Sequence, residues 1–345
     1  METIIFRVDG GNVYSIAMGH VFRCVRLARL LAKKEINSLF IMRDYPEGLD
    51  FVKSAGFEVE LLKENIPLRE ETEKIISRVR QLGASVFIDL RTTKKDLVNA
   101  ANMNGINTIV YEDVCTEDIE PTILINPSLI SFKESRYLKK KTRCLLGTDY
   151  IVFDPTLEKY RRINFSSTIN NLFLCFGGAD PCNISSRVLN ILLCRDDNFK
   201  IVLVLGPAFN HHYEIRKILN EENKMNRVKL VENNSELAPI QSNCDAAITS
   251  GGTIAYELVA ICLPTLVFPS IDYEAHNTAP LLVKGLIKGL KQDIANVYDK
   301  ELIECIDDFL ENTLARKALY NASCEQRLLG GTTRIVSLIQ SLMRS

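Results

Sequence analysis

Hydrophobic and polar positions follow two different periods along this chain. Short continuous runs of Ile, Val, Leu and Phe are separated by longer segments in which apolar residues recur at helical spacing. Strands of a parallel sheet are covered on both faces and are therefore hydrophobic throughout, whereas the connecting helices are amphipathic. In the first half the predicted strands are Ile4–Val8, Ser38–Met42, Glu58–Leu62, Ser85–Leu90 and Thr108–Tyr111, with shorter ones at Leu124–Asn126 and Cys144–Leu146.

The alternation stops at a polar, proline-containing connector, Phe153–Asn171, and then begins again. Helices of the first half are expected at Gly19–Lys34, Leu49–Ala55, Leu68–Leu82 and Lys94–Met103. Strands of the second half are expected at Leu172–Phe176, Ile201–Leu205, Val228–Val231, Ala246–Ile248 and Thr265–Phe268. Helices of the second half are expected at Ile184–Leu193, Tyr213–Leu219, Glu236–Ser242, Ile254–Ile261 and Ala279–Gly285, and from about Ile294 the pattern is helical to the end.

This restart predicts an α/β protein with two doubly wound, Rossmann-like domains that face a central cleft. A length of 345 residues also favours two domains. The first is expected at residues 1–160 and the second at 165–330. Because ligands of open α/β sheets bind at the carboxyl ends of the strands, functional residues are expected directly after strands.

Composition narrows the class of protein without identifying it. The chain is 46% hydrophobic and 25% charged, with a net charge of −1, which gives no electrostatic drive toward nucleic acid or an anionic membrane. No apolar run reaches the length of a membrane-spanning helix, and a strand pattern begins at Thr3, where a signal peptide would lie. Ten cysteines are scattered without a CxxC pair, which favours a reducing, cytoplasmic location and excludes common zinc motifs.

The strongest chemical signal is the stretch Ser250-Gly251-Gly252-Thr253, between a predicted strand and a predicted helix. A strand that passes through glycines into a helix is expected to present unpaired backbone N–H groups and a positive helix dipole, which together bind phosphate. Glu257 lies one helical turn beyond Thr253 and can accept hydrogen bonds from ribose hydroxyls. The structural alternative is a glycine turn followed by a solvated glutamate.

A second signal follows the first strand, in the segment Asp9–Arg23, which reads DGGNVYSIAMGHVFR. Gly19 and His20 open the predicted first helix. A histidine at such a crossover faces the expected cleft and can act as a base or donor near neutral pH. Arg23, about one turn further on, is expected to be an ion-pair partner. The alternative is a structural histidine.

Other strand ends carry glycines or short polar side chains that permit close approach or direct contact with a ligand. They are Gly177 and Gly178, Gly206 before Pro207, Asp89 and Arg91, Glu112 and Asp113, and the segment Glu274–Thr278 with Asn277. Each has a structural alternative as a turn or a helix cap. The fingerprints GxGxxG and GxxxxGK[ST] do not occur in the expected places, so we expect no nicotinamide cofactor and no P-loop. The four histidines are not spaced with cysteines as zinc ligands would be, so we expect no metal.

Many short motifs occur along the chain in the order found in one protein family. They are FRVDGG, GHVFRC, IDLR, YEDV, INPSL, LLGTDY, FGGADPCN, VLGPAFN, AITSGGTIAYE and CLPTLVFP. From Phe6 to Arg334 the chain resembles the UDP-2,4-diacetamido-2,4,6-trideoxy-β-L-altropyranose hydrolases of pseudaminic acid biosynthesis and their spore-coat polysaccharide relatives. That family is similar in fold to the GT-B glycosyltransferases. The resemblance implies a GT-B-like fold, with a C-terminal helix at 331–345 that returns to the first domain.

The resemblance also implies a reaction: metal-independent, inverting hydrolysis of a UDP-linked amino or deoxy sugar, in the biosynthesis of a nonulosonic acid or a surface polysaccharide. His20 would then position or deprotonate the attacking water. The turn at 250–253 would hold the diphosphate, and Glu257 would hold the ribose. The remaining substrate-binding candidates are Asp9, Gly19, Arg23, Arg91, Gly177, Gly178, Gly206 and Asn277.

Two alternatives remain open. A GT-B glycosyltransferase needs the same donor pocket and would add an acceptor, and a protein that only binds a nucleotide sugar would lack the chemical step. The chain departs from the family at Ala17-Met18-Gly19-His20 and at Asn277-Thr278, near the sugar end of the expected pocket. The sequence therefore leaves open which sugar is carried on UDP, which acceptor is used and how the chain oligomerises.

Overall fold

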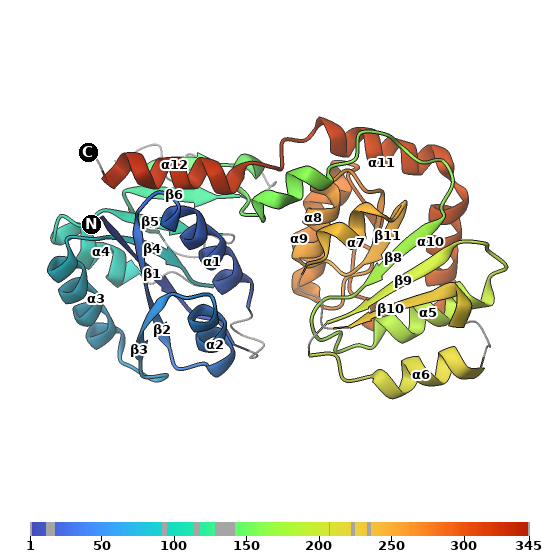
Figure 1. Cartoon of the computed structure of the whole chain (residues 1–345), viewed down its shortest axis with the longest axis horizontal. Coiled ribbons are helices and arrows are strands. Elements are labelled where there is room, and N and C mark those ends of the chain that lie inside the picture. Colours follow the sequence, from blue (N-terminus) through green and yellow to red (C-terminus); the bar gives the residue numbers. More distant parts are fainter. Residues whose placement is uncertain are drawn as a thin grey trace. The chain divides into compact units, whose positions relative to one another are not determined.

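The computed structural model describes residues 2–11, 18–91, 95–112, 118–127, 142–206, 208–221, 225–232 and 236–343. The chain divides into two compact units (Figure 1). Unit 1 comprises Met1–Pro155 together with Leu328–Ser345, and unit 2 comprises Thr156–Arg327. The end of the chain thus belongs to the same unit as its beginning.

Unit 1 is built on a seven-stranded parallel sheet in the order β3-β2-β1-β4-β5-β6-β7. The strands are β1 (Thr3–Val8), β2 (Asn37–Arg43), β3 (Glu58–Leu62), β4 (Ser85–Asp89), β5 (Thr108–Tyr111), β6 (Ile123–Asn126) and β7 (Arg143–Leu146). The chain runs outward from β1 to one edge and then returns to its other side, which is the doubly wound order. The register pairs Val8 with Asp89, so the loops after β1 and β4 leave the sheet side by side.

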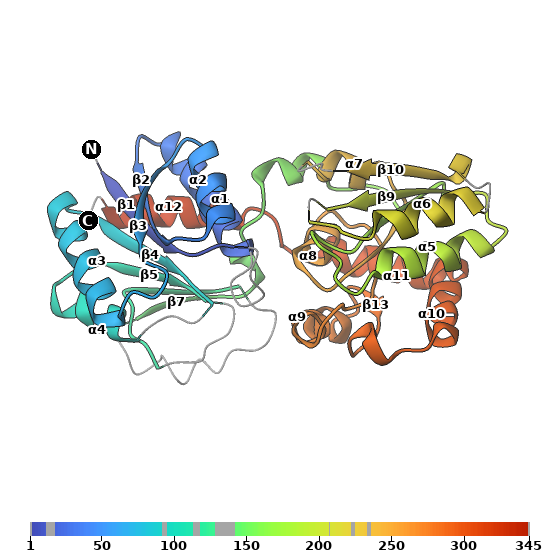
Figure 2. The ribbon, with the colours of Figure 1, turned by 90° about the horizontal axis from the view of Figure 1, so that it is seen from below.

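Helices cover both faces of this sheet (Figure 2). On one face α1 (Gly19–Ala32), α2 (Pro46–Ser54) and α12 (Gly331–Met343) pack on the side chains of Phe6, Phe40 and Phe87. On the other face lie α3 (Leu68–Leu82) and α4 (Lys95–Met103). Helix α12 packs against α1 and buries Ile335, Val336 and Ile339, so the C-terminal segment completes the core of unit 1.

Unit 2 is built on a six-stranded parallel sheet in the order β10-β9-β8-β11-β12-β13. The strands are β8 (Asn171–Cys175), β9 (Lys200–Leu205), β10 (Val228–Glu232), β11 (Ala246–Thr249), β12 (Thr265–Val267) and β13 (Lys288–Gly289). The register places Thr249 between Cys175 and Val267, and the Thr249 hydroxyl donates to the Cys175 carbonyl at 2.7 Å. The loops after β8, β11 and β12 therefore begin at one level of the sheet.

The helices of unit 2 also lie on both faces of its sheet (Figure 1). One face carries α5 (Ile184–Cys194), α6 (His212–Glu221), α10 (Asp299–Glu311) and α11 (Thr313–Glu325), which share the main hydrophobic core. The other face carries α7 (Ala238–Ser242), α8 (Thr253–Ala260) and α9 (Asp272–Val283). Short 3-10 helices occur at Thr148–Tyr150, Pro155–Tyr160, Met225–Arg227 and Ile294–Asn296.

The predicted fold class is confirmed: two parallel sheets, each with helices around it. The prediction for α9 is wrong at its start, because the helix begins at Asp272 and not at Ala279. A proline within a helix usually occupies its first turn, so the sequence pattern placed the start of this helix next to Pro280. In the structure Pro280 lies well inside α9. The stretch from about Ile294, predicted to be helical to the end, is interrupted near Asn312 and again between Glu325 and Gly331. Among the described helices, none is both long and apolar enough to cross a membrane.

Candidate functional site

The first polar cluster of unit 1 is centred on Asp89, at the carboxyl end of β4. Its carboxylate is fully buried. Nδ1 of His20 lies 2.8 Å from Asp89 Oδ1, and Arg23 donates to the same carboxylate from Nε at 2.5 Å and from NH2 at 2.7 Å. The first turn of α1 therefore brings His20 and Arg23 onto one buried negative charge.

These contacts decide the protonation of the histidine ring. Asp89 Oδ1 can only accept, so its contact with His20 Nδ1 needs a proton on that nitrogen, and the Arg23 NH2 group 2.9 Å from Nδ1, which can only donate, then has no acceptor there. We therefore assign the Nδ1 proton to His20, with Asp89 as its acceptor, which leaves Nε2 able to accept a proton. Burial would raise the pKa of Asp89, but the adjacent Arg23 and His20 lower it to about 2, so this acceptor is ionised at neutral pH.

Two further residues complete this cluster. The Cys24 thiol donates to Asp89 Oδ2 at 3.6 Å, and burial together with Asp89 raises the pKa of that thiol well above its ordinary value. The Arg23 guanidinium lies over the Tyr111 ring, with Cζ 4.5 Å from the ring centroid. Arg23 is thus held between a carboxylate and an aromatic face, which fixes its charge beside His20.

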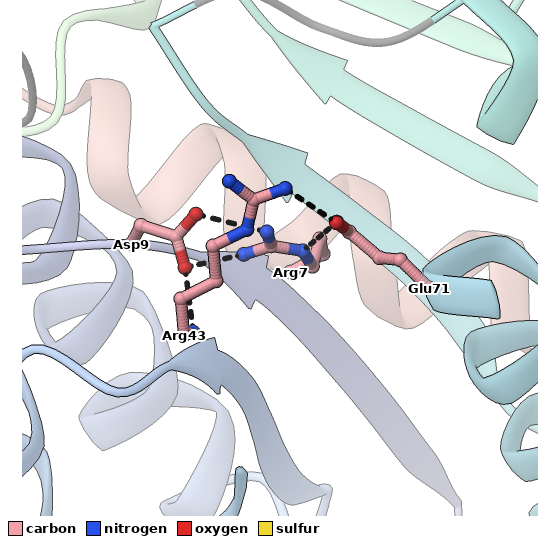
Figure 3. A network of polar contacts seen from close by, with 4 residues as sticks. All are labelled: Arg7, Asp9, Arg43 and Glu71. Carbon is pink, nitrogen blue, oxygen red and sulfur yellow. Dashed lines mark hydrogen bonds and ion pairs between the residues drawn. The ribbon is translucent and has the colours of Figure 1, made fainter. Parts of the chain in front are cut away.

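A second network of unit 1 surrounds Arg7, the only charged residue of β1 (Figure 3). Arg7 is almost fully buried and donates from both terminal nitrogens to Asp9, at 2.6 and 2.8 Å, and from Nε to Glu71 at 2.8 Å. Arg43 donates from its backbone N–H to Asp9 at 2.8 Å and from its side chain to Glu71 at 2.7 Å. Two cations and two carboxylates therefore balance one another at the ends of β1 and β2 and the start of α3.

This network bears on the predicted role of Asp9. Both of its carboxylate oxygens accept hydrogen bonds from Arg7, so Asp9 fixes the beginning of the β1–α1 loop. The same loop is packed closely, because a Cβ on Gly48 would lie 2.1 Å from the Gly10 carbonyl oxygen. Direct contact between Asp9 and a ligand stays a prediction.

In unit 2 the predicted glycines and Ser250 come together at the carboxyl ends of β8, β9 and β11. A Cβ on Gly206 would lie 2.4 Å from Cα and O of Gly178, and one on Gly177 would lie 3.7 Å from Ser250 Oγ. The Ala208 amide donates to the Gly178 carbonyl at 2.9 Å. We call Gly177, Gly178, Gly206, Ser250, Gly251 and Gly252 the glycine cluster.

The turn at Gly251 is tied to helix α9 from both sides. Its carbonyl accepts from the Asn277 side chain at 2.9 Å, and its N–H donates to Glu274 Oε2 at 3.2 Å. The expectation that this turn presents unpaired N–H groups is therefore wrong at Gly251. Asn277 does not cap a helix, because it lies inside α9 and not at its start.

The other predicted residues of unit 2 lie on α8, which begins directly after the glycine cluster. Thr253 is its first residue, and Glu257 lies one turn further on. Nearby, the buried Asp180 caps α5 by accepting from the amides of Ile184 and Ser185, at 2.9 and 2.8 Å. Two helices of at least two turns, α5 and α8, thus begin close to the ends of β8 and β11.

Sequence analysis placed Asp89 and Glu274 in candidate segments but gave neither residue a definite role in the site. The position of Asp89 at the end of a central strand was a usable signal, whereas the contact of Glu274 depends on the true start of α9. Gly19 begins α1, and Arg91 lies exposed two residues beyond Asp89. Of the candidate segments, residues 12–17 with Ala17, and also Asp113 and Pro207, lie outside the described residues.

Sequence comparison finds two curated relatives and no matching family model. The chain is 27% identical over 270 residues to an uncharacterized protein of Methanocaldococcus jannaschii, covering 75% of this chain and 54% of that protein. The chain thus spans about half the length of that relative. It is 24% identical, over 350 aligned residues, to the spore coat polysaccharide biosynthesis protein SpsG of Bacillus subtilis, covering 97% of this chain and 96% of that one.

Solved structures resemble the whole chain. MurG of Acinetobacter baumannii aligns with a TM-score of 0.73 at 14% identity, covering 99% of this chain and 100% of that one. HepE of Anabaena, solved with UDP-glucose, aligns with a TM-score of 0.58 at 12% identity over both full chains. The calicheamicin glycosyltransferase CalG4 aligns with a TM-score of 0.62 at 13% identity, covering 100% of this chain and 98% of that one. The fold is that of the GT-B glycosyltransferases.

Proposed function

We propose that this protein is an enzyme that binds a UDP-sugar and breaks the bond between the anomeric carbon and UDP. The observation that carries the proposal is the glycine cluster, where three strand ends and the start of α8 converge on backbone built largely from glycines. A related fold holding UDP-glucose, that of HepE, supports a UDP-sugar as the ligand. The proposal assigns the nucleotide to unit 2 and the general base to unit 1.

In unit 2 the cluster and α8 would stabilise the leaving diphosphate. Charge develops on the oxygen of the β-phosphate as the bond to the sugar breaks, and fixed N–H donors with a helix dipole stabilise it without moving. Each such donor is worth about 3 kcal/mol of barrier where it has been removed in other enzymes. Glu257, one turn into α8, would accept from the ribose hydroxyls.

In unit 1 His20 would act as the base. Asp89 holds the Nδ1 proton, so Nε2 accepts a proton from the attacking hydroxyl while that oxygen forms its bond to the anomeric carbon. The electron pair of the broken bond goes to the β-phosphate oxygen of UDP. A single displacement of this kind inverts the anomeric configuration.

We favour glycosyl transfer, in which the attacking hydroxyl belongs to a sugar acceptor. The resemblance to CalG4, a calicheamicin glycosyltransferase, and the relationship to SpsG, a spore coat polysaccharide biosynthesis protein, both support transfer in the building of a polysaccharide. The acceptor would then be a growing saccharide or its carrier.

Hydrolysis is the second candidate, because the His20–Asp89 pair is as able to activate water as an alcohol. It is also the reaction of the family that the motifs resemble, in which the UDP-linked sugar is an amino or deoxy sugar on the route to a nonulosonic acid. The two reactions differ only in the nucleophile.

The test is a screen for UDP release from UDP-hexosamine and UDP-deoxy-diacetamido-hexose donors, with and without saccharide acceptors. We expect release that rises on adding an acceptor, and a rate reduced about 100-fold or more in His20→Ala. His276→Ala is the matched control, because His276 is exposed and, within the described part of the chain, bonds to Asp272 of the same helix. Release that is complete without an acceptor would select hydrolysis, and no release under any condition would refute both reactions.

A further inference from the structure

Glu274 places a negative charge on the glycine cluster from the first turn of α9. Its Oε2 accepts from the Gly251 amide at 3.2 Å and from the Ser270 amide at 2.7 Å. Its other oxygen, Oε1, lies 3.5 Å from the position that a Cβ on Gly252 would occupy. The carboxylate therefore covers the same turn that is proposed to hold the diphosphate.

The fit between this side chain and the turn is close. A Cβ on Gly251 would lie 2.6 Å from the Glu274 carbonyl oxygen and 2.8 Å from Glu274 Cβ, so only glycine permits the approach. Burial raises the pKa of Glu274, while the amides of Ser270 and Gly251 oppose that effect by bonding to its charged form. Among the described residues, no Lys or Arg forms an ion pair with Glu274. Its negative charge is stabilised by backbone amides and by the side chains of Ser270 and Ser250.

An anion at the same amides would meet this carboxylate at contact distance. Two like charges a few ångströms apart repel strongly when they are partly shielded from water. A diphosphate and the Glu274 carboxylate therefore compete for the Gly251 N–H, whereas an uncharged nucleoside does not enter that competition.

We propose that the Glu274 carboxylate occupies the Gly251 amide that a diphosphate would bind. By competing for that amide, Glu274 sets the affinity of the nucleotide site for anionic ligands. The inference rests on the proposed function, because it presumes that UDP binds at the glycine cluster. Its consequence is selective. Glu274 weakens the binding of UDP, leaves the binding of uridine unchanged, and favours release of the charged product after the bond to the sugar has broken.

The test compares the affinities of UDP and uridine for wild type and Glu274→Gln by titration calorimetry. Glutamine has nearly the same shape and keeps an oxygen that accepts from Ser270, but it carries no charge. We expect Glu274→Gln to bind UDP about tenfold more tightly, with uridine changed by less than about twofold.

The matched control is Asp272→Asn. It removes the same charge from the same helix end, but the Asp272 side chain is 80% exposed and its ion pair among the described residues is with His276. We expect its affinity for UDP to stay within about twofold of wild type, because exposed charges are screened. An equal gain in both variants would overturn the proposal in favour of a general charge effect.

The remaining outcomes separate this inference from the proposed function. If wild type binds UDP and Glu274→Gln binds it equally or more weakly, Glu274 does not compete and the inference alone fails. If neither protein binds UDP, the proposed function fails and the inference fails with it.

A measurement on wild type alone guards against a variant that folds poorly. The Ser270 amide contacts Glu274 and lies outside the glycine cluster, so its NMR resonance reports where the carboxylate is. We expect saturating UDP to shift the Ser270 and Gly251 amide resonances together, and uridine to leave Ser270 unmoved. A Ser270 resonance that stays unchanged while UDP is bound would contradict displacement.

Discussion

At the scale of residues, the two units differ in the groups that form their polar clusters: charged side chains in unit 1 and mainly backbone amides in unit 2. In unit 1 a buried carboxylate, Asp89, holds the imidazole of His20 and the guanidinium of Arg23 in fixed orientations. In unit 2 the donors are mainly backbone amides, whose positions depend on glycine. Side chains that orient a base and amides that receive a phosphate are the two requirements of the proposed chemistry.

The ion pair of Asp89 predicts how stability depends on pH. The folded protein lowers the pKa of this carboxyl from its ordinary value of 3.8 to about 2, so the stabilisation is present above pH 4 and is lost as pH falls toward 2. The gap between the two pKa values corresponds to about 2 kcal/mol in the free energy of unfolding. Denaturant unfolding of wild type and Asp89→Asn between pH 7 and pH 2 measures it.

Asp89→Asn should be less stable than wild type at pH 7, and the difference should shrink as the solution is acidified. Other carboxyls titrate in the same range, so the difference between the two proteins is the informative quantity. A difference that stays constant from pH 7 to pH 2 would show that the charge of Asp89 contributes nothing to the fold.

Sequence analysis selected His20, Arg23 and Asp89 separately, but it could not join them. His20 and Asp89 are 69 residues apart, and their contact exists only because β1 and β4 are neighbours in the sheet. The pairing of Arg7 with Glu71 spans 64 residues and depends on where α3 begins. Residue types after strands are visible in a sequence, whereas partners across a sheet are not.

At the scale of elements, the close approach of two turns in unit 2 is testable. Gly206, after β9, touches Gly178, after β8, so tightly that a Cβ would lie 2.4 Å from backbone atoms. We expect Gly206→Ala to lower the free energy of unfolding by about 1–3 kcal/mol, the usual cost of overpacking, and to weaken UDP binding by displacing the turn. Denaturant unfolding and calorimetry measure these effects.

The control for this substitution is Gly178→Ala. A Cβ on Gly178 would meet no atom within 4 Å, and its φ lies outside the left-handed range, so the variant should keep the stability of wild type. If both substitutions proved equally harmless, the two turns would not be in the contact described.

Strands were easier to predict than the helix starts that form the site. The buried strands β1, β8 and β11 are uninterrupted apolar runs, and their positions follow from the sequence almost residue by residue. Helix α9 begins with Asp272 and contains a proline, and its early residues are polar. Its start, and with it the contact of Glu274, is fixed by tertiary packing and not by local pattern.

At the scale of the whole molecule, the fold is the best predicted property. Two series of alternating strands and helices, separated by a connector, specify two doubly wound sheets, and the solved structures of GT-B glycosyltransferases share that arrangement. The proposed site depends instead on individual side chains, and parts of its candidate segments, such as residues 12–17, lie outside the described residues. The sequence therefore predicts the fold more completely than it predicts the site.

The central claim, that unit 2 binds UDP at the glycine cluster, is tested most directly by amide hydrogen exchange with and without UDP. We predict slower exchange in peptides that cover Gly177–Gly178 and Ser250–Thr253, because bound phosphate oxygens would accept from those amides. Helix α10, which contains no predicted ligand contact, should exchange equally in both conditions. Slower exchange confined to unit 1, or none at all at saturating UDP, would contradict the account.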